Sequence, residues 1–233
     1  MNSKTERFLD QYRQLEAAVS AAYDLRSGES PVVFLMRRPE FRELRGELEY
    51  CKDVRNLLSH NPKVGERYAV EPSDEMLALM DRVLDRVRHP RQARHIWVPR
   101  ERVYCCTMKD LVRPAMQKMY ERCYTHVPIL KNGAVAGVFS ENTLLSCLLT
   151  QEPVRIDERT RFSDLAVYLP MAQHRAEVFR FVAPSASVSA IETLFAEAAK
   201  KQERIGMIFV TTGGKPTGRL LGIISPQDAA AID

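Results

Sequence analysis

The chain has 233 residues, of which 45% are hydrophobic and 27% charged, and a formal net charge of +4. This composition is that of an ordinary globular protein, and the length suits a helical N-terminal piece followed by a second module. No apolar run reaches the roughly 18 residues that cross a bilayer, and the charged N-terminus lacks a signal-peptide core. We therefore expect a cytoplasmic protein with no membrane partner. Five cysteines without CxxC or zinc-type spacing predict reduced thiols and no metal site.

Residues 1–92 carry three stripes of apolar residues at helical spacing. The stripes are Phe8, Tyr12, Leu15, Val19 and Ala22, then Phe41, Leu44, Leu48, Cys51 and Leu58, then Met76, Met80, Val83 and Val87. A weaker apolar stretch at 31–36 adds a short fourth helix. The pattern predicts a small antiparallel helical bundle.

Arg55 puts a charge on the second stripe, because it lies seven residues after Leu48 and fourteen after Phe41. A lone buried guanidinium is unfavourable, so Arg55 requires an acidic partner, a subunit interface or an anion. The surrounding hexapeptide, RNLLSH, contains Arg55, Asn56 and His60. It resembles the Arg-Asn-x-x-x-His motif of HEPN domains, small helical bundles that commonly dimerise and of which many are metal-independent ribonucleases.

The HEPN resemblance implies a homodimer with RNA as a partner. His60 would move protons, Arg55 would stabilise charge on the phosphate, and Asn56 would hold either side chain in place. Residues five apart on a straight helix point about 140° from each other, so a dimer or a distorted helix end would have to assemble the site. The alternative is a non-catalytic bundle in which Arg55 pairs with an acid of a neighbouring helix and His60 lies at the helix C-terminus.

Residues 93–102 are predicted to be a basic linker. Beyond it, two stretches, 125–148 and 205–232, share one plan: an apolar strand, a Gly-containing turn, a strand ending Gly-apolar-apolar-Ser, and a short helix. Gly137, Ser140 and Thr143 recur 85 residues later as Gly222, Ser225 and Asp228. An amphipathic helix precedes each stretch. The predicted fold class is therefore α+β, with β-α-β-β-α repeats at about 103–150 and 178–233.

The segment GIISPQD at 222–228 resembles the Gly-apolar-apolar-Ser/Thr-x-x-Asp pattern of the CBS (cystathionine β-synthase type) domain, which occurs in tandem pairs. The resemblance covers about 103–233. It implies that Asp228 receives the ribose hydroxyls of an adenine nucleotide (AMP, ADP or ATP) and that Ser225 lies close to the phosphates, with no other cofactor required. A helix N-terminus and a carboxylate suit these two groups.

The first repeat keeps Ser140 but has Thr143 where the pattern has an acid, so its cleft is expected to be weaker or empty. The strand starts, Thr125 and His126 in one repeat and Ile205 and Gly206 in the other, correspond to the edge of the family's base-binding cleft. The alternative is that Ser140 and Ser225 only cap helices and Asp228 is a surface acid.

These expectations describe a ligand-sensing regulatory protein whose CBS pair controls a helical domain that is a candidate ribonuclease. The alternative is a non-enzymatic nucleotide sensor or a dimerisation scaffold.

Overall fold

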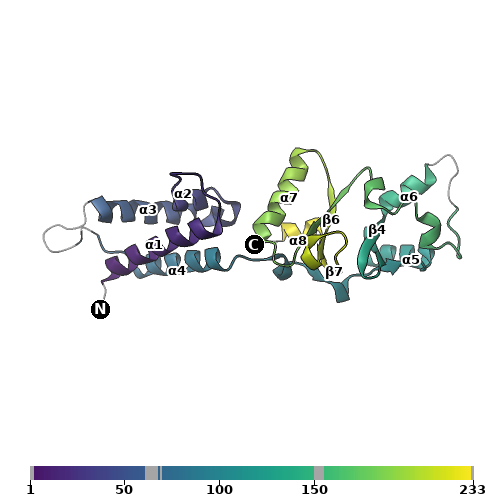
Figure 1. Ribbon diagram of the computed structural model, residues 1–233, viewed down its shortest axis with the longest axis horizontal. Helices are drawn as coiled ribbons and strands as arrows, with labels where there is room; N and C mark the ends of the chain where they lie inside the picture. The colour runs from purple at the N-terminus through teal and green to yellow at the C-terminus, as the bar shows by residue number, and fades with distance from the viewer. Residues whose placement is uncertain (1–2, 61–67, 69, 150–154, 232–233) are drawn as a thin grey trace. The chain divides into compact units, whose positions relative to one another are not determined.

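The computed structural model describes residues 3–60, 68, 70–149 and 155–231. The chain divides into two compact units, Met1–Arg91 and Gln92–Asp233, which are purple to blue and teal to yellow in Figure 1. We describe each unit by itself. Within the described ranges, no helix is both long enough and apolar enough to traverse a bilayer.

The first unit is helical. Its elements are α1 (Lys4–Ala22), α2 (Pro31–Met36), the 3-10 helix η1 (Pro39–Leu44), α3 (Arg45–His60) and α4 (Asp74–Arg88). Serines begin two of the long helices: the side chain of Ser3 accepts from the backbone of Glu6, and that of Ser73 from the backbone of Met76. Proline stands in the first turn of α2 and of η1, where its missing N–H is not needed.

The three predicted apolar stripes meet in one core, in which Phe8, Leu48 and Met80 are fully buried. Ala22, the last residue of the first stripe, is exposed. Burying such stripes contributes most of the stability of short helices, which are marginal alone in water.

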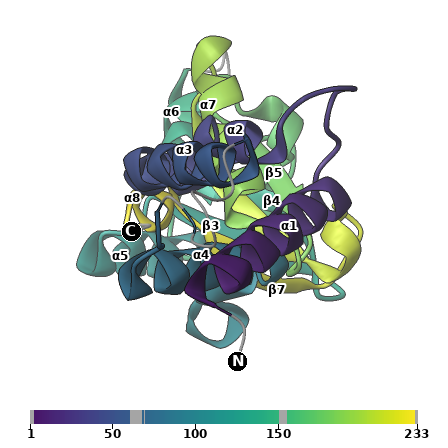
Figure 2. The ribbon, with the colours of Figure 1, turned by 90° about the vertical axis from the view of Figure 1, so that its left-hand side faces the viewer.

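The helix directions differ from the expected antiparallel bundle. α1 and α4 lie side by side (Figures 1 and 2) and run parallel, since Lys4 pairs with Asp74 at 2.8 Å and Arg88 donates to Gln14 at 3.2 Å. α3 runs antiparallel to α1, since Arg55 pairs with Glu16 and Ser59, one turn later, lines the same cavity as Glu6. The chain goes up through α1, back through α3 and up again through α4, so the first and last long helices must share a direction.

The second unit contains two helix-flanked sheets, ordered β2-β3-β4 and β1-β7-β6-β5. The first repeat consists of β2 (Cys106–Thr107), α5 (Val112–Arg122), β3 (His126–Lys131), β4 (Ala134–Ser140) and α6 (Glu141–Leu148). The second consists of β5 (Val178–Val182), α7 (Val188–Lys200), β6 (Ile205–Thr211), η6 (Thr212–Gly214), β7 (Leu220–Ile224) and α8 (Pro226–Ala230). The 3-10 helices η4 (Phe162–Leu165) and η5 (Met171–Gln173) lie between them.

Strand pairing follows one scheme in both repeats. β2 pairs in parallel with β3, and β5 pairs in parallel with β6, with one helix connecting the two strands of each pair. β3 and β4 form an antiparallel hairpin, and so do β6 and β7. The predicted tight turn joins β3 to β4, where Asn132 and Gly133 both have positive φ, at 53° and 81°.

Residues 93–102 belong to the second unit, where a linker was expected. They form η2 (Ala93–His95), β1 (Val98–Pro99) and η3 (Arg100–Arg102), and β1 pairs with β7. Gly222 permits this pairing, because a Cβ there would lie 2.7 Å from the Val98 carbonyl oxygen. The basic residues suggested a linker, but fully buried Ala93 anchors the segment in the core of the second repeat.

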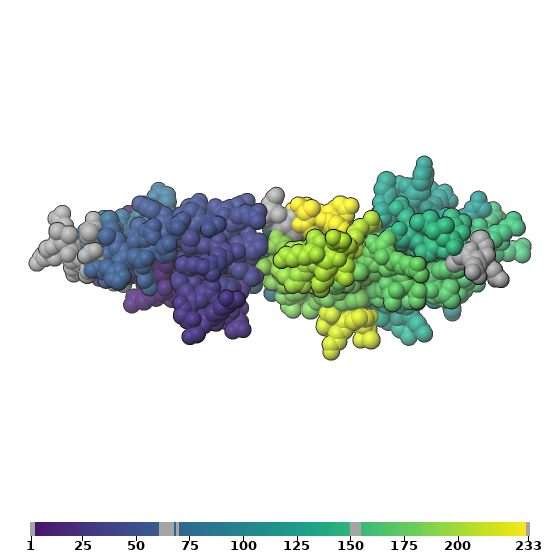
Figure 3. All heavy atoms as spheres, turned by 90° about the horizontal axis from the view of Figure 1, so that it is seen from above, coloured from purple at the N-terminus to yellow at the C-terminus, as the bar shows by residue number. Residues whose placement is uncertain are grey.

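The two sheets pack against each other through apolar side chains from both repeats. This repeat interface consists of Val135, Val138, Phe179, Met207, Phe209 and Leu220. A backbone hydrogen bond joins the two repeats at this interface, from Leu220 to Gly133 at 2.8 Å. In Figure 3 the colours of the first repeat, teal to green, meet those of the second, yellow-green to yellow, across this unit.

Candidate functional site

Ser225 and Asp228 lie where β7 ends and α8 begins. The Ser225 hydroxyl accepts from the Asp228 backbone at 3.2 Å, and Asp228 Oδ2 accepts from the Ser225 backbone and hydroxyl at 2.8 and 2.6 Å. Asp228 is partly exposed, and its Oδ1 has no hydrogen-bond partner in the described part of the chain. A carboxylate accepts about four hydrogen bonds, so Asp228 can cap its helix and still receive further donors.

Trp97, the one tryptophan of the sequence, lies against the strand that leads to this cap. A Cβ at Gly222 would lie 3.0 Å from the indole ring. Trp97 also packs in the same apolar cluster as Ala229, the residue that follows Asp228. Its fluorescence is therefore a local probe of the β7–α8 junction.

Ser140 and Thr143 form the corresponding cap at the start of α6. The Thr143 backbone donates to the Ser140 hydroxyl at 3.3 Å, and the Ser140 backbone donates to the Thr143 hydroxyl at 3.0 Å. The two residues are only 1% and 2% exposed. In this structure neither is open to a ligand.

Glu177, which the sequence analysis did not single out, lies beside Ser140 of the first repeat. Its side chain is fully buried, and its carboxylate accepts from Ser140 at 2.9 Å, from His126 at 2.7 Å and from His174 at 3.1 Å. We call these four residues the Glu177 cluster. The Arg204 guanidinium lies 3.7 Å from the same carboxylate.

The predicted contacts at the strand starts gather around the Glu177 cluster. The Thr125 hydroxyl lies 2.7 Å from His126 Nδ1. A Cβ at Gly206 would lie 2.9 Å from His126 Nε2 and 3.0 Å from Glu177 Oε2, so the backbone approaches closely there. Ile205 is buried in the core of the second repeat. Thr125, His126 and Gly206 thus lie close to one carboxylate of the protein itself, and Ile205 does not.

The cluster keeps Glu177 ionised. Burial alone raises the pKa of this carboxyl, but hydrogen bonds from His126 and His174 outweigh burial and hold the pKa well below its ordinary value. The carboxylate is thus a buried negative charge with donors from both histidines.

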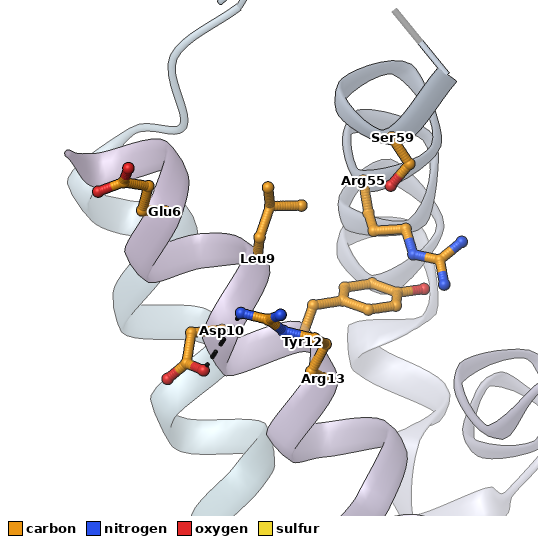
Figure 4. A pocket seen from close by; sticks show the side chains of 7 residues that line it. All are labelled: Glu6, Leu9, Asp10, Tyr12, Arg13, Arg55 and Ser59. Carbon is orange, nitrogen blue, oxygen red and sulfur yellow. Dashed lines mark ion pairs between the residues drawn. The ribbon is translucent and has the colours of Figure 1, made fainter. Parts of the chain in front are cut away.

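In the first unit, Arg55 lines a cavity of about 540 Å³ between α1 and α3 (Figure 4). The described lining residues are Glu6, Leu9, Asp10, Tyr12, Arg13, Arg55 and Ser59. The Arg55 guanidinium pairs with Glu16 at 3.2 Å, donates to Asn56 at 3.1 Å and lies 5.2 Å from the centre of the Tyr12 ring. An acid of a neighbouring helix therefore balances the charge.

His60 is exposed and is not among the residues described as lining this cavity. Ser59, one helical turn after Arg55, takes that place, as expected for residues four apart on one helix. Within one chain, Arg55 and Asn56 are in hydrogen-bond contact, and His60 is not among the residues described around them.

Residues 93–150 match the CBS domain family. This segment is a CBS domain. The match begins at Ala93, inside the segment that pairs with β7, and covers the first repeat. No metal-binding group of His, Cys, Asp and Glu side chains is present in the residues that the structure describes.

Several solved structures are similar to the chain. They include CBSX2 in complex with AMP, at 16% identity and a TM-score of 0.43 over 60% of this chain and 93% of that one. The CBS domain of a bacterial CNNM/CorC family Mg²⁺ transporter in complex with ATP has 15% identity and a TM-score of 0.41 over 60% and 84%. A putative acetoin utilization protein (AcuB) from Vibrio cholerae has 18% identity and a TM-score of 0.43 over 60% and 87%. The comparison with curated proteins found no match.

Proposed function

We propose that the second unit binds an adenine nucleotide at the β7–α8 junction and that the protein is a ligand-sensing regulator. The Asp228 carboxylate carries the proposal: it is held by Ser225, partly exposed, and has an oxygen available for the two hydroxyls of a ribose. The CBS domain at 93–150 and the family pattern at 222–228 support a nucleotide as the ligand.

The proposed stoichiometry is one nucleotide per chain. Ser140 and Thr143 are buried, and the Ser140 hydroxyl donates to the Glu177 carboxylate. An anionic ligand would also meet the charge of Glu177 there, and like charges at short range repel. The acid-containing second repeat is the favoured site.

Regulation requires the nucleotide to prefer one of two arrangements of the protein. We propose that the helical unit is the regulated part and that the chain acts as a homodimer. Ligand binding then biases how the helical units are presented to each other or to a partner.

The fluorescence of Trp97 offers a test of this proposal. Titrating the protein with AMP or ATP is expected to change Trp97 fluorescence saturably, because the indole lies against β7 and α8. Inorganic phosphate serves as the control and is expected to leave the signal unchanged. If neither nucleotide changes the fluorescence or produces heat in calorimetry, the proposal is wrong.

For the helical unit, we propose that Arg55 is a structural link between α3 and α1. Its pairing with Glu16 supports this function. Glu6 and Asp10 also line the cavity, and their carboxylates would repel the phosphates of RNA. The ribonuclease hypothesis then requires a second chain to supply His60.

A cleavage assay distinguishes a structural role of Arg55 from ribonuclease activity. Labelled RNA incubated in chelator with the wild-type protein, Arg55→Ala or His60→Ala is expected to stay intact in all three. Arg55→Ala is expected to lower the stability of the helical unit by at most about 1 kcal/mol, since the ion pair is partly exposed. Cleavage by the wild type that both substitutions abolish would instead establish the ribonuclease.

A further inference from the structure

The Glu177 cluster joins parts of the second unit that are distant in sequence. His126 begins β3, Ser140 ends β4, and His174 and Glu177 belong to the segment that leads into β5. The side chains of His126, His174 and Glu177 are 5%, 1% and 0% exposed. Three donors from two elements of the first repeat and from the connecting segment thus converge on one buried carboxylate.

The hydrogen bonds of His174 define its charge. Its Nδ1 lies 3.1 Å from the Glu177 carboxylate and its Nε2 lies 3.2 Å from the Val138 carbonyl oxygen. A carbonyl oxygen only accepts, and so does an ionised carboxylate, so both ring nitrogens must donate. Only the doubly protonated imidazolium satisfies both contacts. From these contacts we infer that His174 is an imidazolium that faces Glu177.

His126 contributes a second donor. Its Nε2 donates to Glu177 at 2.7 Å, and its Nδ1 lies 2.7 Å from the Thr125 hydroxyl. Arg204, the remaining charged group near the carboxylate, is 67% exposed and 3.7 Å away. Three buried donors, from His126, His174 and Ser140, thus face one carboxylate.

The positions of these donors match what any small oxyanion requires. Charge-assisted hydrogen bonds to carboxylate or phosphate oxygens are among the strongest in proteins. The Ser140 hydroxyl donates from the N-cap of α6, where the helix also favours negative charge. Glu177, as part of the chain, has an effective concentration far above that of a dissolved competitor.

We propose that His126, His174 and Ser140 form an oxyanion-binding site in the first repeat, that Glu177 occupies it as an internal ligand, and that this occupancy keeps the phosphate of an external ligand out. The oxyanion site stands without the proposed function. Only the exclusion of a nucleotide phosphate rests on it.

Chemical rescue of Glu177→Ala tests the site. The substitution removes the carboxylate and leaves the donors, so the variant is expected to have a lower Tm than the wild type in sodium chloride. Sodium acetate at the same ionic strength should raise the Tm of the variant and not that of the wild type. The same experiment is repeated with inorganic phosphate. If phosphate also raises the Tm of Glu177→Ala, the site accepts phosphates as well as carboxylates.

Glu203→Ala is the matched control, because Glu203 is a partly exposed acid paired with Arg180 at 2.7 Å. Its Tm is expected to respond equally to acetate and chloride. If neither acetate nor phosphate raises the Tm of Glu177→Ala above this control, no oxyanion site exists.

A measurement on the wild type keeps the proposal testable even if Glu177→Ala does not fold. Long-range ¹H–¹⁵N NMR at neutral pH is expected to show both ring nitrogens of His174 protonated. A neutral His174 would overturn the charged site.

Nucleotide stoichiometry tests the exclusion separately. If the wild type binds one nucleotide per chain, Glu177→Ala is expected to bind two, and an unchanged stoichiometry overturns the exclusion. A wild type that binds no nucleotide would remove the proposed function, while acetate rescue would still decide on the oxyanion site.

Discussion

Replacing Glu177 with alanine is expected to destabilise the second unit by about 3–5 kcal/mol, the range for breaking a buried ion pair by removing one partner. The loss is large because the His174 imidazolium then remains buried without its carboxylate, and Ser140 and His126 lose their acceptor. Urea unfolding followed by Trp97 fluorescence measures it, since the single tryptophan lies in this unit.

Glu203→Ala provides the comparison for this loss. The partly exposed ion pair between Glu203 and Arg180 is expected to contribute less than about 1 kcal/mol to the free energy of unfolding. A Glu177→Ala variant as stable as Glu203→Ala would contradict the inferred role of the Glu177 cluster.

The stability that the Glu177 carboxylate contributes is expected to depend on pH. The folded protein depresses the pKa of Glu177 below its ordinary 4.5, so the stabilisation is complete above that pH and declines as the pH falls below it. The gap in stability between the wild type and Glu177→Gln is therefore expected to narrow in acid.

Replacing Asp228 with alanine is expected to weaken adenine nucleotide binding by about 10- to 100-fold. Hydrogen bonds to a charged group contribute about 1.5–3 kcal/mol, and each 1.4 kcal/mol changes affinity about tenfold. Asp228→Asn keeps the shape and one acceptor and is expected to lose less. Titrations followed by Trp97 fluorescence compare the three proteins.

Asp164→Ala controls for the loss of a capping carboxylate. Asp164 accepts from the Arg161 backbone at 2.8 Å at the start of η4, so it resembles Asp228 in its capping role but lies outside the proposed site. Its nucleotide affinity is expected to equal that of the wild type. Equal affinities for Asp228→Ala and wild type would place binding elsewhere.

Features encoded by local patterns could be predicted from the sequence. The apolar stripes, the Asn132–Gly133 turn and the serine caps each depend on residues within one or two turns of the chain. The parallel direction of α1 and α4 depends on how three helices follow one another in space, which periodicity does not encode. The two-residue strand β1 is too short for a periodic signal and exists because Gly222 lets it approach β7.

The candidate site also contains residues that a local motif marks and residues that only the fold brings together. Ser225 and Asp228 share a short motif, and the structure places them in the predicted cap. His174 and Glu177 belong to an irregular segment between the repeats, where no pattern marks a residue as buried. They lie beside His126 and Ser140 only in the folded chain, so sequence analysis named His126 and Ser140 and missed His174 and Glu177.

Calorimetric titration of the wild-type protein with AMP and ATP tests the central claim most directly. We predict saturable heat with one site per chain for at least one of the two nucleotides. An absence of heat with both, at protein concentrations well above micromolar, would contradict a nucleotide-sensing role.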